Sequence, residues 1–523
     1  MKLTAEAFLP HASARRFDVC IIGSGAAGLC IANELASTGA SVALLEAGRH
    51  RDDEESQSCY AVELPELEVF GATQGRFRVP GGSTTRWAGQ ALPLDPGDFE
   101  ARPWVPFSGW PISYREVERY YRQAAAFMFV DEMDYQEHLA STLCARTAAF
   151  DPSLIRHQFS KFSLRPDLRL SYLPRLEKSA NVTVVTGANM VSLNLSSSSD
   201  TIESVSLVSY AGLTAKMSAS KYVMCCGAIE NARLLLASHD HRPAGVGNEH
   251  GLVGRFFQDH PGCHVGTIAS RDPDALQDLF NIYYRKGMRY KPRFSPSPEL
   301  QGERRILNIS GVLLFEQKPD SAFAVLRDAA RDARKGKFSL LKLAQVFGGI
   351  AELGQLTQFV WSRFSKGRHY NPNAEIRLAF SAEQEPDPES RIMLSTKAKD
   401  RFGMPLAVVQ WRLTESVART IWEFSHVVAD EMRRLRLGEV VFYPWMNKDF
   451  ATWKDSLRDN NHHIGTTRMG AKPQDGVVDG DCRVHSVANL YIAGSSVFPT
   501  GGHSNPTLTL LALAMRLADH LKQ

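Results

Sequence analysis

The chain of 523 residues is too long for one simple core, and at roughly 100–200 residues per domain it suffices for two or three. Its 60 basic and 57 acidic residues leave a net charge of +3, which argues against a nucleic-acid partner. No apolar run approaches the roughly 20 residues of a membrane span, so we expect no transmembrane segment.

The first apolar run could be mistaken for an export signal because Arg15 and Arg16 precede it. The run contains glycines, ends at Glu34 and lacks a small-residue cleavage site. We therefore interpret it as a strand followed by a helix and expect a cytoplasmic protein.

The N-terminal segment has the pattern of a dinucleotide-binding unit. A strand is predicted over 17–22, a helix through residue 35, and a second strand over 41–45 that ends at Glu46. Between the first strand and the helix stands Gly23-Ser24-Gly25-Ala26-Ala27-Gly28, whose glycines let the backbone approach a pyrophosphate at the helix start. Glu46 is placed to bind both ribose hydroxyls of an adenosine. The sequence therefore predicts a nucleotide cofactor.

A second glycine-rich loop spans residues 80–89, where glycines and hydroxyls alternate around Trp87. Backbone N–H groups of such a loop can wrap a planar ring and a phosphate. The alternative is an ordinary surface turn.

The cysteines argue against a metal site. All eight lack Cys-x-x-Cys spacing, which excludes zinc-ribbon and iron–sulfur patterns, so we predict no metal. Cys225 and Cys226 lie in an apolar run, and we interpret them as small buried hydrophobes rather than a redox pair.

The middle of the chain predicts antiparallel strands and helices. Amphipathic helices are expected over 114–128 and 415–437, and a half-buried strand over 374–380. Two further helical patterns cover 322–335 and 340–364. The second is apolar with basic ends, so it could pack on its own domain, cover an active site or lie on a membrane surface.

Two polar clusters near the C-terminus combine imidazole and amide groups. His462 and His463 precede Gly465-Thr466, and His503 and Asn505 precede an apolar helix expected over 508–517. Imidazole exchanges a proton near neutral pH, and an amide orients a hydroxyl without changing charge. A structural role in glycine-rich loops is the alternative.

These motifs, with residues 226–235 and 253–261, resemble the glucose–methanol–choline (GMC) flavin oxidoreductases. The resemblance covers roughly residues 17–110, 180–265 and 375–523, and Glu46-Ala47-Gly48 looks like an FAD protein more than an NAD one. It implies FAD as cofactor, with contacts at Gly23, Ser24, Gly25, Gly28, Glu46, Ala47, Gly81, Gly82, Ser83, Thr84, Trp87, Met190, Gly227, Glu230, Gly494, Ser495, Asn505, Pro506 and Thr507.

The resemblance also implies a mechanism. His462 matches the family's base, which removes a hydroxyl proton while hydride passes to flavin N5, and Asn505 matches its partner. His463, His503 and Gln384 are further candidates for substrate contact.

The C-terminal third is similar to pyranose oxidase-like members. Pyranose oxidases attach FAD through a histidine just before the tryptophan of the glycine-rich loop, whereas Arg86 stands there in this chain. We therefore expect non-covalent FAD.

The sequence thus predicts an α/β protein with a Rossmann-like FAD-binding domain and an α+β substrate domain built from an antiparallel sheet and helices. The first is expected over 15–105, 176–265 and 455–523, and the second over 106–175 and 266–454. The expected activity is oxidation of a secondary alcohol of a sugar, glycoside or polyol to a ketone, with oxygen, a quinone or another acceptor.

Two alternative functions remain open. One is a hydroxynitrile-lyase-type lyase on the same scaffold. The other is a membrane-associated dehydrogenase that passes electrons to a cytochrome or quinone. The sequence does not predict the oligomeric state.

Overall fold

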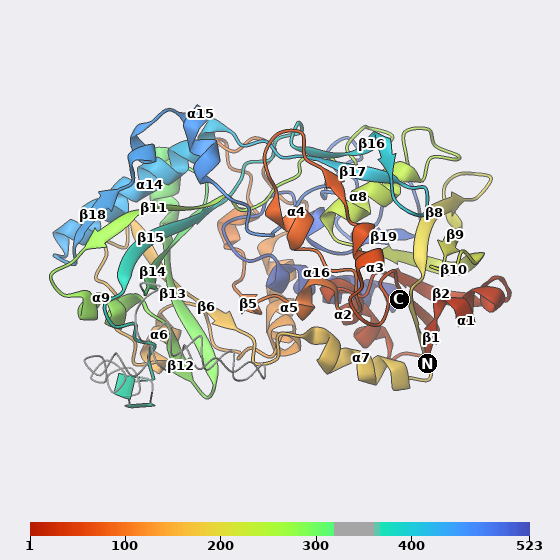
Figure 1. The fold of residues 1–523 in the computed structure, drawn as a ribbon, viewed down its shortest axis with the longest axis horizontal. Helices are drawn as coiled ribbons and strands as arrows, with labels where there is room; N and C mark the ends of the chain where they lie inside the picture. The colour runs from red at the N-terminus through yellow and green to blue at the C-terminus, as the bar shows by residue number, and fades with distance from the viewer. Residues whose placement is uncertain (318–360, 363, 366) are drawn as a thin grey trace, which may run out of the picture.

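A computed structural model describes residues 1–317, 361–362, 364–365 and 367–523, and its chain folds into two lobes (Figure 1). The helices expected over 322–335 and 340–364 lie outside the described residues, apart from 361–362 and 364. Within the described part of the chain, no helix is long and apolar enough to cross a membrane.

One lobe contains a mainly parallel sheet. The pairs along β1–β7–β3–β2–β10 and the pair β10–β19 are parallel, whereas β10–β9 and β9–β8 are antiparallel. The order is β1 (Lys2–Thr4), β7 (Val182–Thr186), β3 (Val42–Glu46), β2 (Arg16–Ile22), β10 (Thr214–Met224), β9 (Ile202–Val208) and β8 (Asn189–Leu195), with β19 (Leu490–Ile492) beside β10.

The predicted dinucleotide-binding unit is confirmed as a strand–helix–strand. Strand β2 leads through the glycine loop into α2 (Ala26–Leu35), and β3 follows and ends at Glu46. Every residue of β3 is buried, as expected for a central parallel strand. Gly28 is required by packing because a Cβ there would lie 1.9 Å from the Gly23 carbonyl oxygen.

The other lobe contains an antiparallel sheet, as predicted. Helices α9 (Pro273–Phe280) and α14 (Glu415–Arg434) pack against its strands, and α14 confirms the helix expected over 415–437. The order is β18 (Glu439–Phe442), β11 (Gly262–Ala269), β15 (Glu375–Ala382), β14 (Ile309–Glu316), β13 (Met288–Pro296), β6 (Ile155–Phe162) and β5 (Gln90–Ala91), with β12 (Tyr283–Arg285) beside β13.

A three-stranded sheet lies against the first lobe. Strand β17 (Pro405–Gln410) pairs with β16 (Arg391–Lys399) and with β4 (Val62–Glu63), and β16 and β17 pack on α8 (Ala228–Ala237). The expected division assigned residues 391–410 to the substrate domain, whereas these contacts join them to the FAD side. The exact division into two domains therefore stays a proposal.

The C-terminal helix α16 (Thr507–Leu521) packs against α2 and α5 (Tyr114–Phe127). Ten of its fifteen residues are buried, because its apolar run faces both partners. Other α-helices among the described residues are α1 (Ala5–Phe8), α3 (Glu54–Ser58), α4 (Phe70–Gln74), α6 (Glu137–Thr142), α7 (Leu168–Lys178), α10 (Pro298–Arg304) and α15 (Phe450–Trp453).

A buried ion pair joins the loop after β5 to the end of β15. Both terminal nitrogens of Arg102 donate to the Glu383 carboxylate, at 2.7 and 2.5 Å, and the side chains are 7% and 0% exposed. The Asn308 backbone N–H donates to the same carboxylate at 2.9 Å.

Removing Glu383 should therefore leave a buried, uncompensated guanidinium. We expect Glu383→Ala to lower the free energy of unfolding by about 3–5 kcal/mol. Glu389 pairs with Arg255 at the surface, where solvent screens the charges, so Glu389→Ala should cost far less than Glu383→Ala. Urea unfolding of both variants measures the difference, and equal losses would contradict this reading.

Candidate active site

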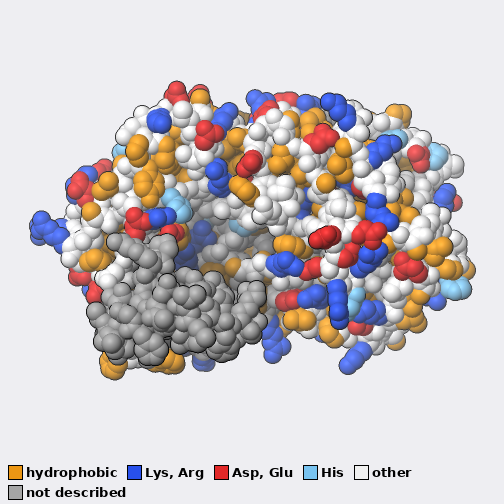
Figure 2. Space-filling view, viewed as in Figure 1, with side chains coloured by type: hydrophobic (Ala, Val, Ile, Leu, Met, Phe, Trp, Pro, Cys, Tyr) orange, Lys and Arg blue, Asp and Glu red, His pale blue; other side chains and the backbone are white. Residues whose placement is uncertain are grey.

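A cavity of about 1300 Å³ is lined by residues of both lobes, and Figure 2 shows the surface hollowed between them. The lining brings together the glycine loops, the start of α16 and strands of the antiparallel sheet. The sequence-predicted residues that line it are Gly23, Ser24, Gly25, Glu46, Gly82, Ser83, Thr84, Trp87, Gly227, His462, His463, Gly494, Ser495, His503, Asn505, Pro506 and Thr507.

A second cavity, of about 50 Å³, adjoins the first. Tyr60 and Cys226 line both cavities. Met190 and Glu230 line only the smaller one. Met190 is one of the expected FAD contacts, so the smaller cavity stays a candidate place for part of the cofactor.

The loop at the start of α2 fits a cofactor pyrophosphate. A Cβ built on Gly25 would meet no atom within 4 Å, so the backbone there is open toward the cavity. The Glu46 carboxylate holds the loop, since it accepts from Ser24 N–H at 3.1 Å, from Ser24 Oγ at 2.6 Å and from Gly48 N–H at 2.7 Å. Unpaired N–H groups and the helix dipole favour an anion at this end.

The two glycine loops are joined. The Gly81 N–H donates to the Ser24 carbonyl at 3.1 Å, and Trp87 Nε1 donates to the Pro166 carbonyl at 2.6 Å. Gly28, Ala47 and Gly81, which were expected to contact FAD, do not line either cavity.

Glu230 and Arg86 are each held by an ion pair. Glu230 pairs with Arg76 at 2.9 Å and with Arg233 at 3.1 Å. Burial opposes ionisation of Glu230, but Arg233 and Arg76 outweigh it and lower its pKa. Arg86 pairs with Asp52, and its guanidinium stacks over a phenylalanine ring.

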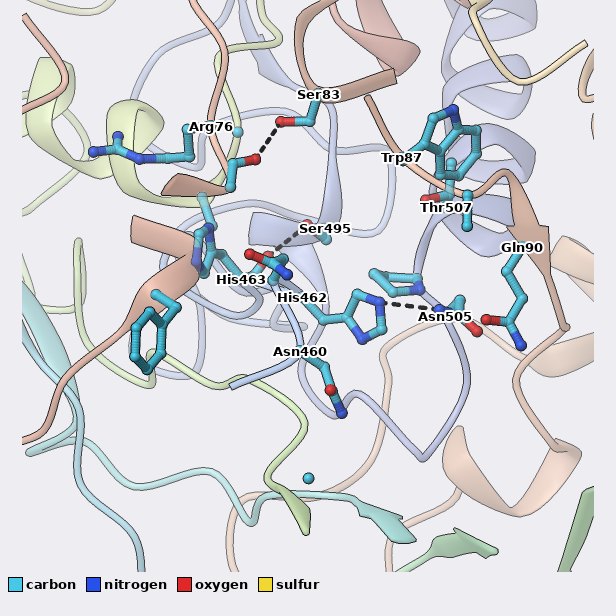
Figure 3. Close-up of a pocket in the computed structure, with 18 of the residues that line it drawn as sticks. Arg76, Ser83, Trp87, Gln90, Asn460, His462, His463, Ser495, Asn505 and Thr507 are labelled. Carbon is cyan, nitrogen blue, oxygen red and sulfur yellow. Dashed lines mark hydrogen bonds between the residues drawn. The ribbon is translucent and has the colours of Figure 1, made fainter. Parts of the chain in front are cut away.

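The structure brings the predicted catalytic pair together. His462 Nε2 lies 3.0 Å from Asn505 Nδ2 (Figure 3). His462 stands in a loop that exchanges backbone hydrogen bonds with residue 258 on one side and with residues 495 and 496 on the other. Asn505 lies just before α16, so a backbone of defined geometry positions each side chain.

The hydrogen bonds fix which nitrogen of His462 accepts. Arg293 Nη1 donates to Asn505 Oδ1 at 3.5 Å, so the amide oxygen faces the guanidinium and the amide nitrogen faces His462. His462 Nε2 therefore accepts, and its Nδ1–H donates to His260 Nδ1 at 2.8 Å. His260 in turn donates from Nε2 to the Gly501 carbonyl at 3.2 Å. The Nε2 lone pair of His462 thus faces the cavity wall at Asn505.

Electrostatics keep both imidazoles neutral. Burial, with smaller contributions from His260, Arg293 and His463, lowers the pKa of His462 well below its usual range. Burial lowers the pKa of His260 to about 4. At neutral pH His462 is therefore ready to accept a proton.

His463 belongs to a buried group with two carboxylates. Its Nε2 lies 3.9 Å from Asp259 Oδ2, and ligand atoms of Asp259, Asp459 and His463 all lie within 4.8 Å of one another. The carboxylates are already engaged by backbone N–H groups, including those of Phe70 and Gly71 on Asp459. Burial, then Arg76, lowers the pKa of His463 to about 3.

His503 and Gln384 have different surroundings. His503 is 2% exposed, and its Nε2 lies 3.7 Å from Asp95 Oδ2. Gln384 does not line the cavity, because its amide is used inside the protein. It accepts from Trp411 Nε1 at 2.8 Å and donates to the Arg412 carbonyl at 2.9 Å. We therefore withdraw Gln384 as a substrate contact and retain His463 and His503.

Three site residues were not singled out from the sequence. Asp259 and His260 stand in the motif 253–261, which was quoted only for its resemblance. Arg293 stands at the end of a basic and aromatic stretch, residues 283–293. A polar residue in an otherwise buried strand is the signal that could have identified it: Arg293 is 8% exposed on β13.

Comparisons with known proteins identify a family match and several relatives. Residues 386–514 match the GMC oxidoreductase family, and residues 21–51 match an NAD(P)-binding Rossmann-like domain. The large subunit of fructose dehydrogenase from Gluconobacter japonicus is 24% identical over 96% of this chain and 97% of its own length. A C-glycoside 3-oxidase from Arthrobacter globiformis is 32% identical over 29% of this chain and 28% of its own.

Solved structures share the fold. Pyridoxine 4-oxidase from Mesorbium loti has a TM-score of 0.56 at 17% identity, over 97% of this chain and 99% of that chain. Formate oxidase has a TM-score of 0.58 at 16% identity, over 97% and 98%.

The fold, the glycine loops that line the cavity and the similarity to known proteins together define the class of FAD-dependent oxidoreductases. Within that class, the chain is similar to the GMC oxidoreductases, as the motifs predicted, and the match to this family covers residues 386–514. The narrower likeness to pyranose oxidases stays a prediction.

Adding a methyl group at Gly25 tests the cradle without disturbing the fold. We expect Gly25→Ala to bind FAD at least about tenfold more weakly, a loss of ~1.4 kcal/mol, because the methyl group would occupy the space left for the phosphates. Gly39→Ala is the matched control, since a Cβ there also meets no atom within 4 Å and Gly39 does not line the cavity. Flavin absorbance relative to protein measures the effect, and equal flavin content in both variants would refute it.

Proposed function

We propose that the protein oxidises a secondary alcohol of a sugar, glycoside or polyol to a ketone, with His462 as general base. The observation that carries this proposal is the pair His462 Nε2–Asn505 Nδ2, 3.0 Å apart at the cavity wall, with the base held neutral. A neutral imidazole at the cavity wall is suited to remove a hydroxyl proton once the substrate hydroxyl replaces the Asn505 amide as the donor to Nε2.

The relatives support this class of substrate. Besides fructose dehydrogenase and C-glycoside 3-oxidase, the chain is similar to paromamine 6'-oxidase from Streptomyces fradiae, 24% identical over 96% of this chain and 91% of the relative. These names refer to sugars, glycosides and related compounds. The relatives include both oxidases and dehydrogenases, so they favour neither oxygen nor another acceptor.

The side chains divide the work. His462 Nε2 takes the hydroxyl proton, and its Nδ1–H stays bonded to His260, which holds the ring in one orientation. Asn505 Nδ2, which donates to His462 Nε2 in the free protein, would donate instead to the hydroxyl oxygen and position it beside the base. Bound FAD would supply the acceptor for the hydride from the carbinol carbon. Residues of both glycine loops and of the smaller cavity would hold it.

We also propose that FAD is bound without a covalent link. The guanidinium of Arg86 stands where the resemblance places a flavin-linking histidine. A guanidinium stays protonated in proteins and is a poor nucleophile, and this one is already paired with Asp52.

Removing the base should stop the reductive step. We expect His462→Ala to slow anaerobic flavin reduction by at least about 10²-fold with FAD content intact. Asn505→Ala should slow the same step less, because it removes orientation and leaves the base. His485→Ala is the control: its ring nitrogen bonds the Gly470 carbonyl outside the cavity. Rapid mixing with a panel of sugars, glycosides and polyols measures the rates, and wild-type reduction by His462→Ala would exclude this base.

The lowered pKa of His462 predicts the pH dependence. A base works only when unprotonated, so activity is lost as pH falls through its pKa. Because that pKa is well below 6.5, kcat/KM for flavin reduction should stay level from mildly alkaline pH down through 6.5 and fall only in more acidic solution. A decline centred at or above 6.5 would contradict the proposed state of His462.

A further inference from the structure

Arg293 is a buried cation without an acidic partner. It comes from β13 and lines the cavity with 8% of its surface exposed. Its Nε donates to Ser310 Oγ at 2.8 Å and its Nη1 to Asn505 Oδ1 at 3.5 Å. Throughout the described part of the chain, no carboxylate lies within 4.0 Å of this guanidinium.

The other arginines that line the cavity either have an acidic partner or lie near the protein surface. Arg76 pairs with Glu230 and Arg86 with Asp52, while Arg458 donates to the carbonyls of residues 455 and 457 near the protein surface. Burial lowers the pKa of Arg293 to about 10, so it remains protonated at neutral pH. A buried charge without a counter-charge costs several kcal/mol. Such a cost at an active site indicates that the counter-charge arrives with a ligand.

The surroundings reinforce the positive field. Lys291 lies two residues earlier on the same side of β13. Burial and the charge of Arg293 lower the pKa of Lys291 to about 8, and the described residues offer it no ion pair. Asp95 reaches this part of the sheet through Gln158, but it is paired with Arg156 at 2.8 Å.

We infer that Arg293 is an anion-binding subsite and that the alcohol oxidised carries a carboxylate, as uronic acids, aldonic acids and acidic glycosides do. The inference rests on the proposed function and specifies its substrate. A guanidinium binds a carboxylate through two parallel hydrogen bonds. Only the amide of Asn505 separates this guanidinium from His462 Nε2, so an acid with its reacting hydroxyl a few bonds from the carboxylate spans both groups.

Arg293 could instead serve only its neighbours. It orients the Asn505 amide and lowers the pKa of His462. A purely local role would change the pH dependence of flavin reduction for every alcohol alike. A substrate-binding role would, in addition, change the preference between acidic and neutral alcohols.

Matched substrates separate these roles. The probes are methyl β-D-glucopyranoside with its uronic acid, and D-glucose with D-gluconate. We expect the wild-type protein to reduce its flavin with higher kcat/KM for the acids. Arg293→Gln should lower kcat/KM about 10- to 100-fold more for each acid than for its neutral counterpart, the size of a lost bond to a charged group. Arg293→Lys should retain part of the preference. Arg289→Gln, on the exposed start of the same strand, should leave it unchanged.

A binding experiment keeps this inference distinct from the proposed function. Tetrahydropyran-2-carboxylate has no hydroxyl to oxidise, and its binding is measured by the change in the flavin spectrum. We expect the affinity to fall in Arg293→Gln and to persist in Arg289→Gln. Loss of binding without oxidation of any alcohol would support the anion site and refute the proposed function.

Other outcomes would overturn the inference. Equal use of acidic and neutral alcohols by the wild-type protein, with Arg293→Gln moving only the pH profile, would reduce Arg293 to a positioning residue for Asn505 and His462. A preference for D-glucose 6-phosphate over both acids would replace the carboxylate with a phosphate.

Discussion

The arrangement of the site depends on one buried carboxylate, that of Asp259. It accepts hydrogen bonds from the backbone N–H groups of His260, Asn460 and His462, at 2.6, 2.9 and 2.9 Å. Burial and the neighbouring Asp459 raise its pKa to about 8, so these donors are needed to compensate a side chain that is poorly placed for ionisation. These hydrogen bonds join the segment before β11 to the loop that carries His462. If the two segments moved apart, three buried backbone N–H groups and the Asp259 side chain would lose their hydrogen-bond partners, which is energetically costly.

The hydrogen bonds to Asp259 also explain why the rings of His260 and His462 lie next to each other in the site. The backbone N–H groups of His260 and His462 both donate to Asp259, and the two rings meet through Nδ1 atoms 2.8 Å apart. One imidazole fixes the tautomer of the other without adding a charge. A carboxylate in the position of His260 would stabilise a protonated His462, whereas a neutral imidazole leaves its pKa low. The protein thus obtains orientation and low basicity from one contact.

Much of the fold and part of the site could be predicted from sequence. The strand–helix–strand at residues 16–46 follows from its apolar pattern and from a glycine motif that is typical of a tight turn between strand and helix. The helix after Asn505 follows from its apolar run. Arg293 could not be identified in this way, because its meaning depends on which strands of the antiparallel sheet lie beside Asn505. Gln384 was misjudged for a related reason: an amide near an active site can equally fasten a tryptophan and two loops, and only tertiary contacts distinguish the two uses.

The first sheet receives its last strand, β19, from residues 490–492, and the helix that follows carries Asn505 at its start. During synthesis on the ribosome, the glycine cradle is therefore finished hundreds of residues before the partner of the base exists. A chain released early would hold an open half-site with β10 lacking a neighbour, prone to aggregate and without activity. Turnover by this protein therefore requires that translation has passed Asn505.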